Sequence, residues 1–247
     1  MVFAAGLGTR MRPITEHTPK ALVKLGGKTL LDYALDSFEA AGCERIVVNL
    51  HHLGDLIRDH LRARPRGGAE ICLSDESPQL LETGGGVVKA LPLLGDAPFF
   101  CANSDTVWFD GPASALDRLA DEYAAHDETD ALLLLHRKTQ AVGYRGQGDF
   151  ALNGEGRLFR GAERPFVFTG LQVLHPRLLR GRTAEPFSLR ELYLAAERAS
   201  TDGHLERMRG LIHAGDWVHV GSPADLADAE RFVQARSEAG AKTESTG

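Results

Sequence analysis

The first twenty residues constrain the fold more than any other part of the chain. A short apolar run, residues 2–5 (VFAA), leads directly into a glycine loop, residues 6–10 (GLGTR). When a buried strand ends in glycines, backbone N–H groups at its end can surround phosphate oxygens. Three cations follow closely, Arg10, Arg12 and Lys20. The segment therefore predicts a triphosphate-binding turn at the end of a buried strand.

Two commoner glycine loops do not fit this segment. A dinucleotide-binding fingerprint needs a third glycine where Met11 stands. A Walker A loop ending at residues 27–29 (GKT) needs a glycine where Leu22 stands. A tight turn in which Gly6 and Gly8 adopt positive φ without any ligand is the remaining alternative. The nearby cations favour a bound triphosphate.

Composition excludes several classes of partner. The 247 residues carry a net charge of −6 with both signs mixed along the chain, so neither nucleic acid nor a membrane surface is indicated. Cys43, Cys72 and Cys101 form no C-x-x-C pair, which indicates reduced thiols. No signal peptide or membrane-spanning run is visible, so we expect a cytoplasmic protein. Because only five residues precede Gly6, we also expect the natural chain to begin upstream of Met1.

Short apolar strands alternate with longer amphipathic segments through the first half of the chain. We expect an extended piece at 22–25, helices at 30–41, 53–64, 82–94 and 112–125, and strands at 46–48, 98–102 and 131–135. This alternation predicts an α/β fold with a mostly parallel central sheet and helices on both faces. Ligands of such sheets bind beyond the carboxyl ends of the strands, where the loop after Ala5 lies.

The pattern changes after residue 136. Strands at 158–159 and 166–174 follow each other without a helix, which predicts a smaller mixed β portion. Ser188 and Glu191 have the spacing of a capping box for another helix. We expect a final strand or hairpin at 211–213 and 217–220, a last helix from Pro223, and a disordered tail at 241–247.

These motifs together resemble a known enzyme family. Residues 4–13 (AAGLGTRMRP) and 18–23 (TPKALV) are similar to the motifs of sugar-phosphate nucleotidyltransferases, and especially to those of N-acetylmuramate-1-phosphate uridylyltransferases. The resemblance implies a Rossmann-like, GT-A-like nucleotidyltransferase fold. It implies one domain over 1–240, with a nucleotide-binding half at 1–136, a sugar-binding half at 137–221 and a C-terminal helix at 222–240. The implied reaction transfers UMP from UTP to N-acetylmuramate 1-phosphate in peptidoglycan recycling, giving UDP-N-acetylmuramate and pyrophosphate.

The resemblance places the nucleotide on the glycine loop. Arg10 would stabilise the departing β- and γ-phosphates, and Lys20 would bridge the α-phosphate and the sugar phosphate. Glu82 and Gly84 would grip the base and ribose. The three glycines at 84–86 disfavour a helix start, so they predict that another group approaches the backbone closely; a plain flexible turn is the alternative. The other implied nucleotide contacts are Ala5, Gly6, Leu7, Gly8, Thr9 and Asn103.

The sugar phosphate would lie against the later part of the chain. Asp149, in a G-D-F segment typical of the uridylyltransferases, would accept hydrogen bonds from sugar hydroxyl or amide groups. Thr169 and Gly170 would line the same pocket. Glu163 is implied there too, although a solvated loop charge explains it equally well.

One metal position departs from the family pattern. Asp105 follows a buried strand, where an aspartate is either a turn residue or, beside a triphosphate, a ligand that suits Mg²⁺. The family motif N-x-D, matched at residues 103–105, implies that Asp105 is the main protein ligand of the metal. The family pattern W-x-D-x-G-T supplies a second carboxylate, and His219 stands in its place. Three hypotheses stay open: Asp105 and the triphosphate hold Mg²⁺ alone, which we favour; His219 shifts the preference toward Mn²⁺ or Co²⁺; or the protein binds nucleotide sugars without turnover.

Other functions remain compatible with these motifs. A mannose-1-phosphate guanylyltransferase, or another hexose-1-phosphate nucleotidyltransferase, would keep the fold and mechanism and change the small-molecule substrates. A non-catalytic nucleotide-sugar-binding regulatory protein is supported by His219 alone. A metal-dependent glycosyltransferase is disfavoured, because residues 103–105 (NSD) lack the paired acids of a D-x-D motif. The sequence does not determine the oligomeric state.

Overall fold

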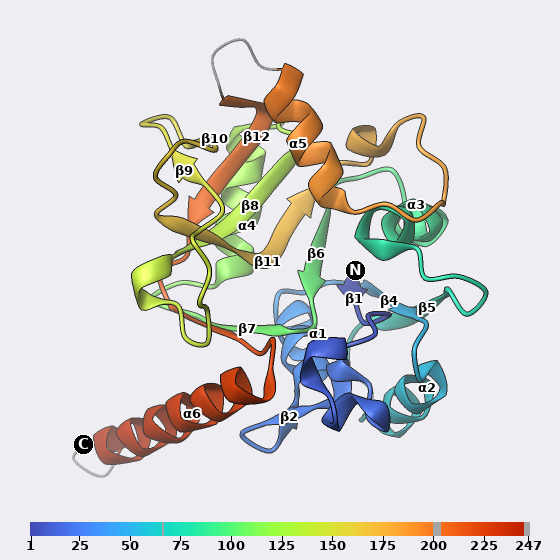
Figure 1. The fold of residues 1–247 in the computed structure, drawn as a ribbon, viewed down its shortest axis with the longest axis vertical. Coiled ribbons are helices and arrows are strands. Elements are labelled where there is room, and N and C mark those ends of the chain that lie inside the picture. Colours follow the sequence, from blue (N-terminus) through green and yellow to red (C-terminus); the bar gives the residue numbers. More distant parts are fainter. Residues whose placement is uncertain (66, 200–203, 245–247) are drawn as a thin grey trace.

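A nine-stranded sheet forms the centre of the computed structural model, which describes residues 1–65, 67–199 and 204–244 (Figure 1). From one edge to the other the strands are β5 (Glu70–Asp75), β4 (Arg45–Leu50), β1 (Val2–Phe3), β6 (Phe99–Asn103), β11 (Phe166–Leu174), β8 (Ala131–Arg137), β12 (His204–Ile212), β10 (Arg157–Phe159) and β9 (Ala151–Leu152). Only β11 and β10 run against the direction of the others in this described sheet. The predicted Rossmann-like α/β fold with a mostly parallel sheet is confirmed.

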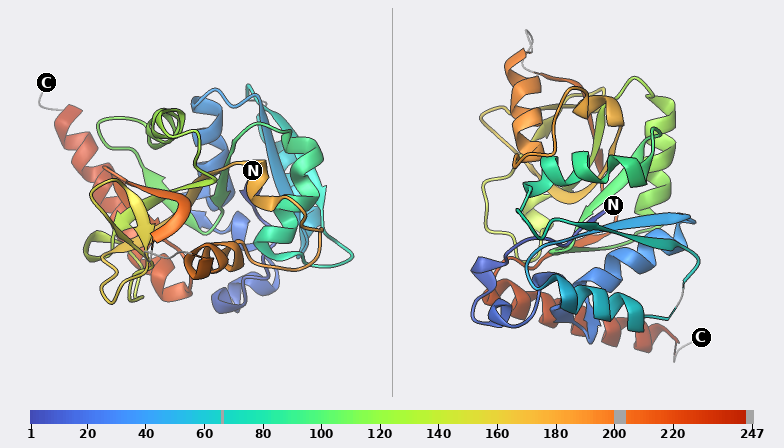
Figure 2. Two further views of the ribbon diagram at one scale, coloured as in Figure 1. Left: turned by 90° about the horizontal axis from the view of Figure 1, so that it is seen from above. Right: turned by 90° about the vertical axis from the view of Figure 1, so that its right-hand side faces the viewer.

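Helices cover both faces of the sheet because its central strands are apolar on both sides (Figure 2). In β4, Ile46 and Val48 pack on one face and Val47 on the other, as the two-residue period of a strand requires. The first face is covered by α1 (Leu30–Ala40), α2 (Gly54–Ala63) and α4 (Ala115–Ala125). The second face is covered by α3 (Glu82–Leu94) and α5 (Leu189–Ala199).

Side-chain caps decide where several helices begin. Thr29 accepts a hydrogen bond from the Asp32 N–H at the start of α1. Ser114 caps α4 in the same way, so this helix begins at Ala115 and not near residue 112. The predicted capping box at α5 is confirmed: the Ser188 N–H donates to Glu191 Oε1 at 3.2 Å, and Ser188 Oγ accepts from the Arg190 N–H at 3.3 Å.

Two short antiparallel pairs and the last helix lie outside the main sheet. They are β13 (Asp216–His219) with β7 (Thr106–Phe109), β2 (Lys24–Leu25) with β3 (Lys28–Thr29), and α6 (Pro223–Glu244). Buried residues of these elements, including Val107, Val218 and Ala229, form one cluster with Met11 of the glycine-loop region. The small elements therefore pack against the glycine-loop region through Met11. No helix in the described ranges is both long and apolar enough to cross a bilayer.

Two expectations for the C-terminal part are wrong. Residues 211–213 and 217–220 form neither one strand nor a hairpin, because both edges of β12 are occupied by β8 and β10, and β13 pairs with β7 instead. The helix α6 continues to Glu244, so residues 241–244 are helical, while 245–247 lie outside the described residues. The strands β5 and β7 were not predicted: β5 is a half-buried edge strand whose apolar run covers only residues 71–73, and β7 is separated from β6 by only two residues.

Candidate active site

Polar side chains hold the glycine loop where it leaves β1. Asn49 Oδ1 accepts hydrogen bonds from the N–H groups of Ala4 and Ala5 at 2.7 and 3.3 Å. Gly8 has a φ of 62°, and a Cβ there would stand 2.9 Å from Thr15 Cγ2. Thr15 Oγ1 in turn donates to the Gly8 carbonyl at 2.7 Å. Glycine is therefore required at position 8 both for its backbone conformation and for close packing, and the loop has a fixed shape.

Behind the loop lies a buried polar pair that sequence analysis missed. Glu76 is 0% exposed and Asn49 is 2% exposed. Asn49 Nδ2 donates to Glu76 Oε1 at 2.7 Å, and Glu76 Oε2 accepts from the Leu81 N–H at 3.1 Å. The pair thus positions the end of β1 and the start of α3 together. The sequence feature that could have indicated this pair is Asn49, a polar residue that directly follows the apolar run 46–48.

A cavity of about 380 Å³ opens above the glycine loop, beyond the carboxyl ends of β1 and β6. It brings together most of the candidate nucleotide and metal residues, namely Ala5, Gly6, Leu7, Gly8, Thr9, Lys20, Glu82, Asn103 and Asp105. It also contains residues not singled out before, including Phe3, Asn49, Thr83 and Ser104. Arg10 stands outside this lining, exposed on the 3₁₀ turn Thr9–Met11.

The glycines at the start of α3 make room for another segment of the chain. A Cβ on Gly84 would lie 2.2 Å from the ring of Phe187, and one on Gly85 would lie 2.0 Å from the carbonyl oxygen of Glu185. The Gly84 N–H donates to the Phe187 carbonyl at 2.8 Å. The predicted close approach is present, but the approaching group is the segment at 185–187. Gly84 is buried and lies outside the cavity lining, where its neighbours Glu82 and Thr83 are found.

Lys20 and Asp105 meet in this cavity although they are 85 positions apart. Lys20 Nζ lies 2.9 Å from Asp105 Oδ2, and the two side chains are 13% and 27% exposed. Burial raises the pKa of Asp105, but the charges of Lys20, His219 and Arg10 outweigh burial and hold this pKa below its ordinary value. Asp105 is therefore an ionised carboxylate beside a cation at neutral pH.

The metal-binding donors around Asp105 are few. The Val220 N–H donates to the Asp105 carbonyl at 2.9 Å, which brings His219 close to Asp105. The His219 ring stacks on Trp217 at 6.0 Å, and its Nδ1 lies 3.4 Å from the Gly143 carbonyl oxygen. Among the described residues, no group of three His, Cys, Asp or Glu side chains could hold a metal. A divalent cation would fit this site if phosphate oxygens completed the coordination shell that Asp105 begins.

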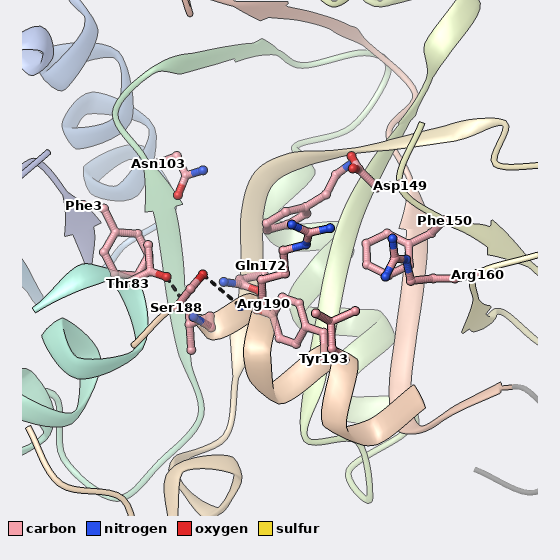
Figure 3. Close-up of a pocket in the computed structure, with 13 residues that line it drawn as sticks. Phe3, Thr83, Asn103, Asp149, Phe150, Arg160, Gln172, Ser188, Arg190 and Tyr193 are labelled. Carbon is pink, nitrogen blue, oxygen red and sulfur yellow. Dashed lines mark hydrogen bonds between the residues drawn. The ribbon is translucent and has the colours of Figure 1, made fainter. Parts of the chain in front are cut away.

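A second cavity of about 230 Å³ adjoins the first and shares Phe3, Thr83 and Asn103 with it (Figure 3). Asp149 lines this cavity, and its Oδ2 accepts a hydrogen bond from the Phe168 N–H at 2.9 Å. Sequence analysis missed its other residues, which come chiefly from α5 and β11: Phe150, Arg160, Phe168, Gln172, Ser188, Leu189, Arg190, Tyr193 and Leu194.

Thr169 does not line the second cavity, contrary to expectation. It is 0% exposed. Its Oγ1 donates to the Leu134 carbonyl at 2.9 Å, and its own carbonyl accepts from Trp217 Nε1 at 2.9 Å. A register shift in β11 between Phe168 and Gln172 accompanies this inward orientation. Thr169 therefore links β11 to β8 and β13.

Gly170 and Glu163 also lie outside the lining of the second cavity. Gly170 has a φ of 88°, and a Cβ there would stand 2.9 Å from the Cβ of Asn103. Because Gly170 has no side chain, it leaves room for Asn103, which lines both cavities. Glu163 is exposed on the loop before β11, which agrees with its alternative reading as a solvated charge.

The two cavities share three lining residues but differ in their chemistry. The first offers loop amides, a half-buried lysine and a carboxylate, which suit a triphosphate with a divalent cation. The second offers amide, hydroxyl, guanidinium and carboxylate groups beside aromatic rings, which suit a sugar. Because Asn103 belongs to both, groups bound in the two cavities would meet near Asn103 and Asp105.

Curated relatives match the chain almost from end to end. It is 42% identical over 241 residues to an N-acetylmuramate alpha-1-phosphate uridylyltransferase of Caulobacter vibrioides, covering 95% of this chain and 97% of that protein. It is 31% identical over 245 residues to a protein of the same name from Neisseria meningitidis serogroup B, covering 95% and 98%.

Solved structures share the fold. The crystal structure of HddC from Yersinia pseudotuberculosis complexed with GMP-PN has a TM-score of 0.73 and 20% identity, covering 94% of this chain and 97% of that one. Residues 1–216 match the family model of the MobA-like NTP transferase domain. This match spans both cavities and all nine strands of the main sheet. The chain therefore belongs to the MobA-like NTP transferase family, within the sugar-1-phosphate nucleotidyltransferases.

Proposed function

We propose that this protein transfers UMP from UTP to N-acetylmuramate 1-phosphate, forming UDP-N-acetylmuramate and pyrophosphate. The observation that carries the proposal is the Lys20–Asp105 pair, set in the glycine-loop cavity next to a second cavity of sugar size. Both curated relatives described above are named for this activity. We further propose that the reaction takes place in the cytoplasm and serves peptidoglycan recycling.

The attacking group needs no general base. The second pKa of a phosphate is about 6, so the sugar phosphate oxygen is already ionised near neutral pH. It attacks the α-phosphorus of UTP, and the bond from that phosphorus to the β-phosphate oxygen breaks as pyrophosphate leaves. Catalysis then consists of aligning two polyanions and neutralising the charge that develops.

The chain supplies fixed positive charge for that task. Amides of the loop at 6–9 would bind the triphosphate, and Lys20 would lie between the α-phosphate and the incoming sugar phosphate. Arg10 is exposed beside the loop and would reach the departing β- and γ-phosphates. Glu82 and Asn103 would contact the nucleoside, while Asp149 would accept hydrogen bonds from the sugar.

A divalent cation, which we propose to be Mg²⁺, would be held by Asp105 together with phosphate oxygens. When bound, it supplies positive charge that orients the triphosphate and stabilises the leaving group. Mn²⁺ or Co²⁺ would suit the His219 imidazole better. Lys20 remains the chain's own cation beside Asp105.

A substrate panel tests the proposal. Pyrophosphate release is measured with UTP, GTP, CTP and dTTP, each paired with N-acetylmuramate, N-acetylglucosamine and mannose 1-phosphates. UTP with N-acetylmuramate 1-phosphate should give the highest kcat/KM. A preference for GTP and mannose 1-phosphate would replace the proposal by a guanylyltransferase. Tight UDP-sugar binding without turnover in either Mg²⁺ or Mn²⁺ would indicate a regulatory protein.

A further inference from the structure

The second cavity has an excess of positive charge that its proposed role in binding a sugar does not explain. Arg160 and Arg190 line this cavity. Among the described residues that line it, Asp149 is the only one with an acidic side chain. One carboxylate oxygen of Asp149 is already bonded to the Phe168 N–H. The phosphate of a sugar 1-phosphate is already assigned to Lys20 of the first cavity, and the rest of a neutral sugar would need hydroxyl and amide partners but no cation.

The two arginines differ in their partners. Arg160 Nη1 lies 3.4 Å from Glu197 Oε2, with side chains 20% and 29% exposed, so a carboxylate of the chain balances its charge. Arg190 is exposed, and its side chain makes no ion pair or hydrogen bond with any described residue. Figure 3 shows its guanidinium extending from α5 into the cavity. Arg190 is thus the cation that remains available to a ligand.

Helix stability does not account for Arg190. It is the second residue of α5, where the helix dipole favours acidic side chains and disfavours cations. The adjacent Glu191 follows that preference and completes the capping box with Ser188. A cation placed against the dipole, without an acidic partner in the described part of the chain, indicates a role in binding.

Two buried polar side chains line the same cavity as Arg190. Gln172 is 2% exposed and Tyr193 is 6% exposed. The Tyr193 hydroxyl donates to Gln172 Oε1 at 2.5 Å, so the amide oxygen of Gln172 is occupied and its NH₂ group is the part left to donate. Guanidinium and amide donors together match the acceptor-only chemistry of a carboxylate.

We propose that Arg190 binds a carboxylate carried by the sugar and thereby selects acidic sugar 1-phosphates over neutral ones, with Gln172 donating a supporting hydrogen bond. This inference rests on the proposed function. N-acetylmuramate differs from N-acetylglucosamine only by a lactyl ether, and that ether ends in a carboxylate. Arg190 therefore reads the single group that distinguishes the two sugars.

Equilibrium binding tests this inference separately from turnover. The dissociation constants of UDP-N-acetylmuramate and UDP-N-acetylglucosamine are measured by calorimetry for the wild-type protein, for Arg190→Gln and for Arg198→Gln. Arg198 is an exposed residue near the end of α5, outside the cavity, so its replacement makes the same charge change on the same helix. Arg190→Lys keeps the charge and loses the planar fork.

The wild-type protein should bind the acidic nucleotide sugar more tightly. Arg190→Gln should weaken that binding roughly ten- to a hundredfold, as expected for a charge-assisted hydrogen bond. Affinity for the neutral nucleotide sugar should change less than about twofold. Arg190→Lys should fall between these values, and Arg198→Gln should match the wild type.

Two results would overturn the inference while the proposed reaction stands. The first is an acidic-to-neutral affinity ratio that Arg190→Gln leaves unchanged; the second is equal weakening for both ligands, which would show a general effect on the site. Thermal unfolding of each variant identifies any loss of folding. If Arg190→Gln does not fold, the acidic-to-neutral affinity ratio of Arg190→Lys is compared with that of the wild type instead. Absence of turnover in a wild-type protein that still discriminates through Arg190 would contradict the proposed function alone.

Discussion

At the scale of single residues, the site depends on contacts between groups of opposite charge that lie far apart in the chain. Lys20 pairs with Asp105, and this pair keeps the carboxylate ionised despite burial. Sequence motifs indicated both residues separately. The structure places Lys20 Nζ 2.9 Å from Asp105 Oδ2, so each side chain positions the other before any substrate binds.

Lys20→Ala tests the role proposed for this lysine. We expect kcat to fall by more than about a hundredfold, because one fixed electrostatic stabiliser is removed from the reacting phosphates. Pyrophosphate release at saturating substrates measures the effect. Lys24→Ala, an exposed lysine on β2, is the matched control and should keep its activity. Near-normal turnover of Lys20→Ala would remove Lys20 from the mechanism.

His219→Asp tests how the site holds its metal. We expect Mg²⁺ to support turnover in the wild-type protein, and the variant to reach half-maximal rate at a Mg²⁺ concentration several-fold lower, since a second carboxylate suits Mg²⁺ better than imidazole. Metal-titrated pyrophosphate release provides the measurement. Activity of the wild type with Mn²⁺ or Co²⁺ but not Mg²⁺ would favour ligation by His219 instead.

At the scale of helices and strands, the start of α3 is shaped by its contact with the segment before α5. Thr83 Oγ1 accepts a hydrogen bond from the Leu189 N–H at 2.9 Å, and Gly84 and Gly85 lie against residues 185–187. The two cavities share Thr83, so this contact sets the spacing between the proposed nucleotide and sugar sites. Gly84 and Gly85, which the sequence suggested as a close-approach site for a ligand, therefore form a tight packing contact between α3 and the segment before α5. This contact is called the α3–α5 joint.

Gly85→Ala tests this joint. Alanine normally stabilises a helix by about 1 kcal/mol relative to glycine. Here its Cβ would stand 2.0 Å from the Glu185 carbonyl oxygen, so we expect a net loss of about 1–3 kcal/mol in the free energy of unfolding. Denaturant titration measures it. At Gly154 a Cβ would meet nothing within 4 Å, so Gly154→Ala should change stability little. A Gly85→Ala variant more stable than wild type would contradict the tight joint.

At the scale of the whole molecule, two buried histidines lie where the main sheet meets the small β7–β13 pair. His136 and His213 are 4% and 5% exposed, with ring centroids 6.1 Å apart. His213 Nε2 lies 3.1 Å from the Phe109 carbonyl oxygen, to which it can only donate. Burial is the main cause that lowers the pKa of each histidine below 6.5, so both are neutral in the folded protein at neutral pH.

These histidines predict a loss of stability in mild acid. A folded-state pKa below the unfolded value gives stability that is complete above about pH 6.5 and is lost as the pH falls below it, by up to about 1.4 kcal/mol per pH unit for each histidine. Unfolding midpoints measured from pH 7.5 to 5 should decline, and His213→Gln should flatten the decline. His17→Gln, at an exposed histidine, should leave it unchanged. Equal slopes for all three proteins would contradict this assignment.

Local patterns made much of the fold predictable. The apolar run before the glycine loop, the period of helices α1 and α2 and the capping box of α5 depend on neighbours within a few positions, which the sequence displays directly. The glycine-loop motif also indicated Lys20, and the end of the strand predicted at 98–102 indicated Asp105; the structure brings these two residues together. By contrast, β12 and β13 were wrongly joined, because strand pairing depends on which sheet edges are already occupied.

The sequence by itself determined that an α/β sheet ends in a phosphate-binding loop with cations beside it, because strand period, glycine turns and charge are short-range properties of the chain. Only the tertiary structure decided that Thr169 turns inward, that Asn49 and Glu76 support the loop, and that Arg190 extends into the second cavity. Those outcomes depend on packing between segments that are distant in sequence, and a side chain's orientation is set by the neighbours it meets there.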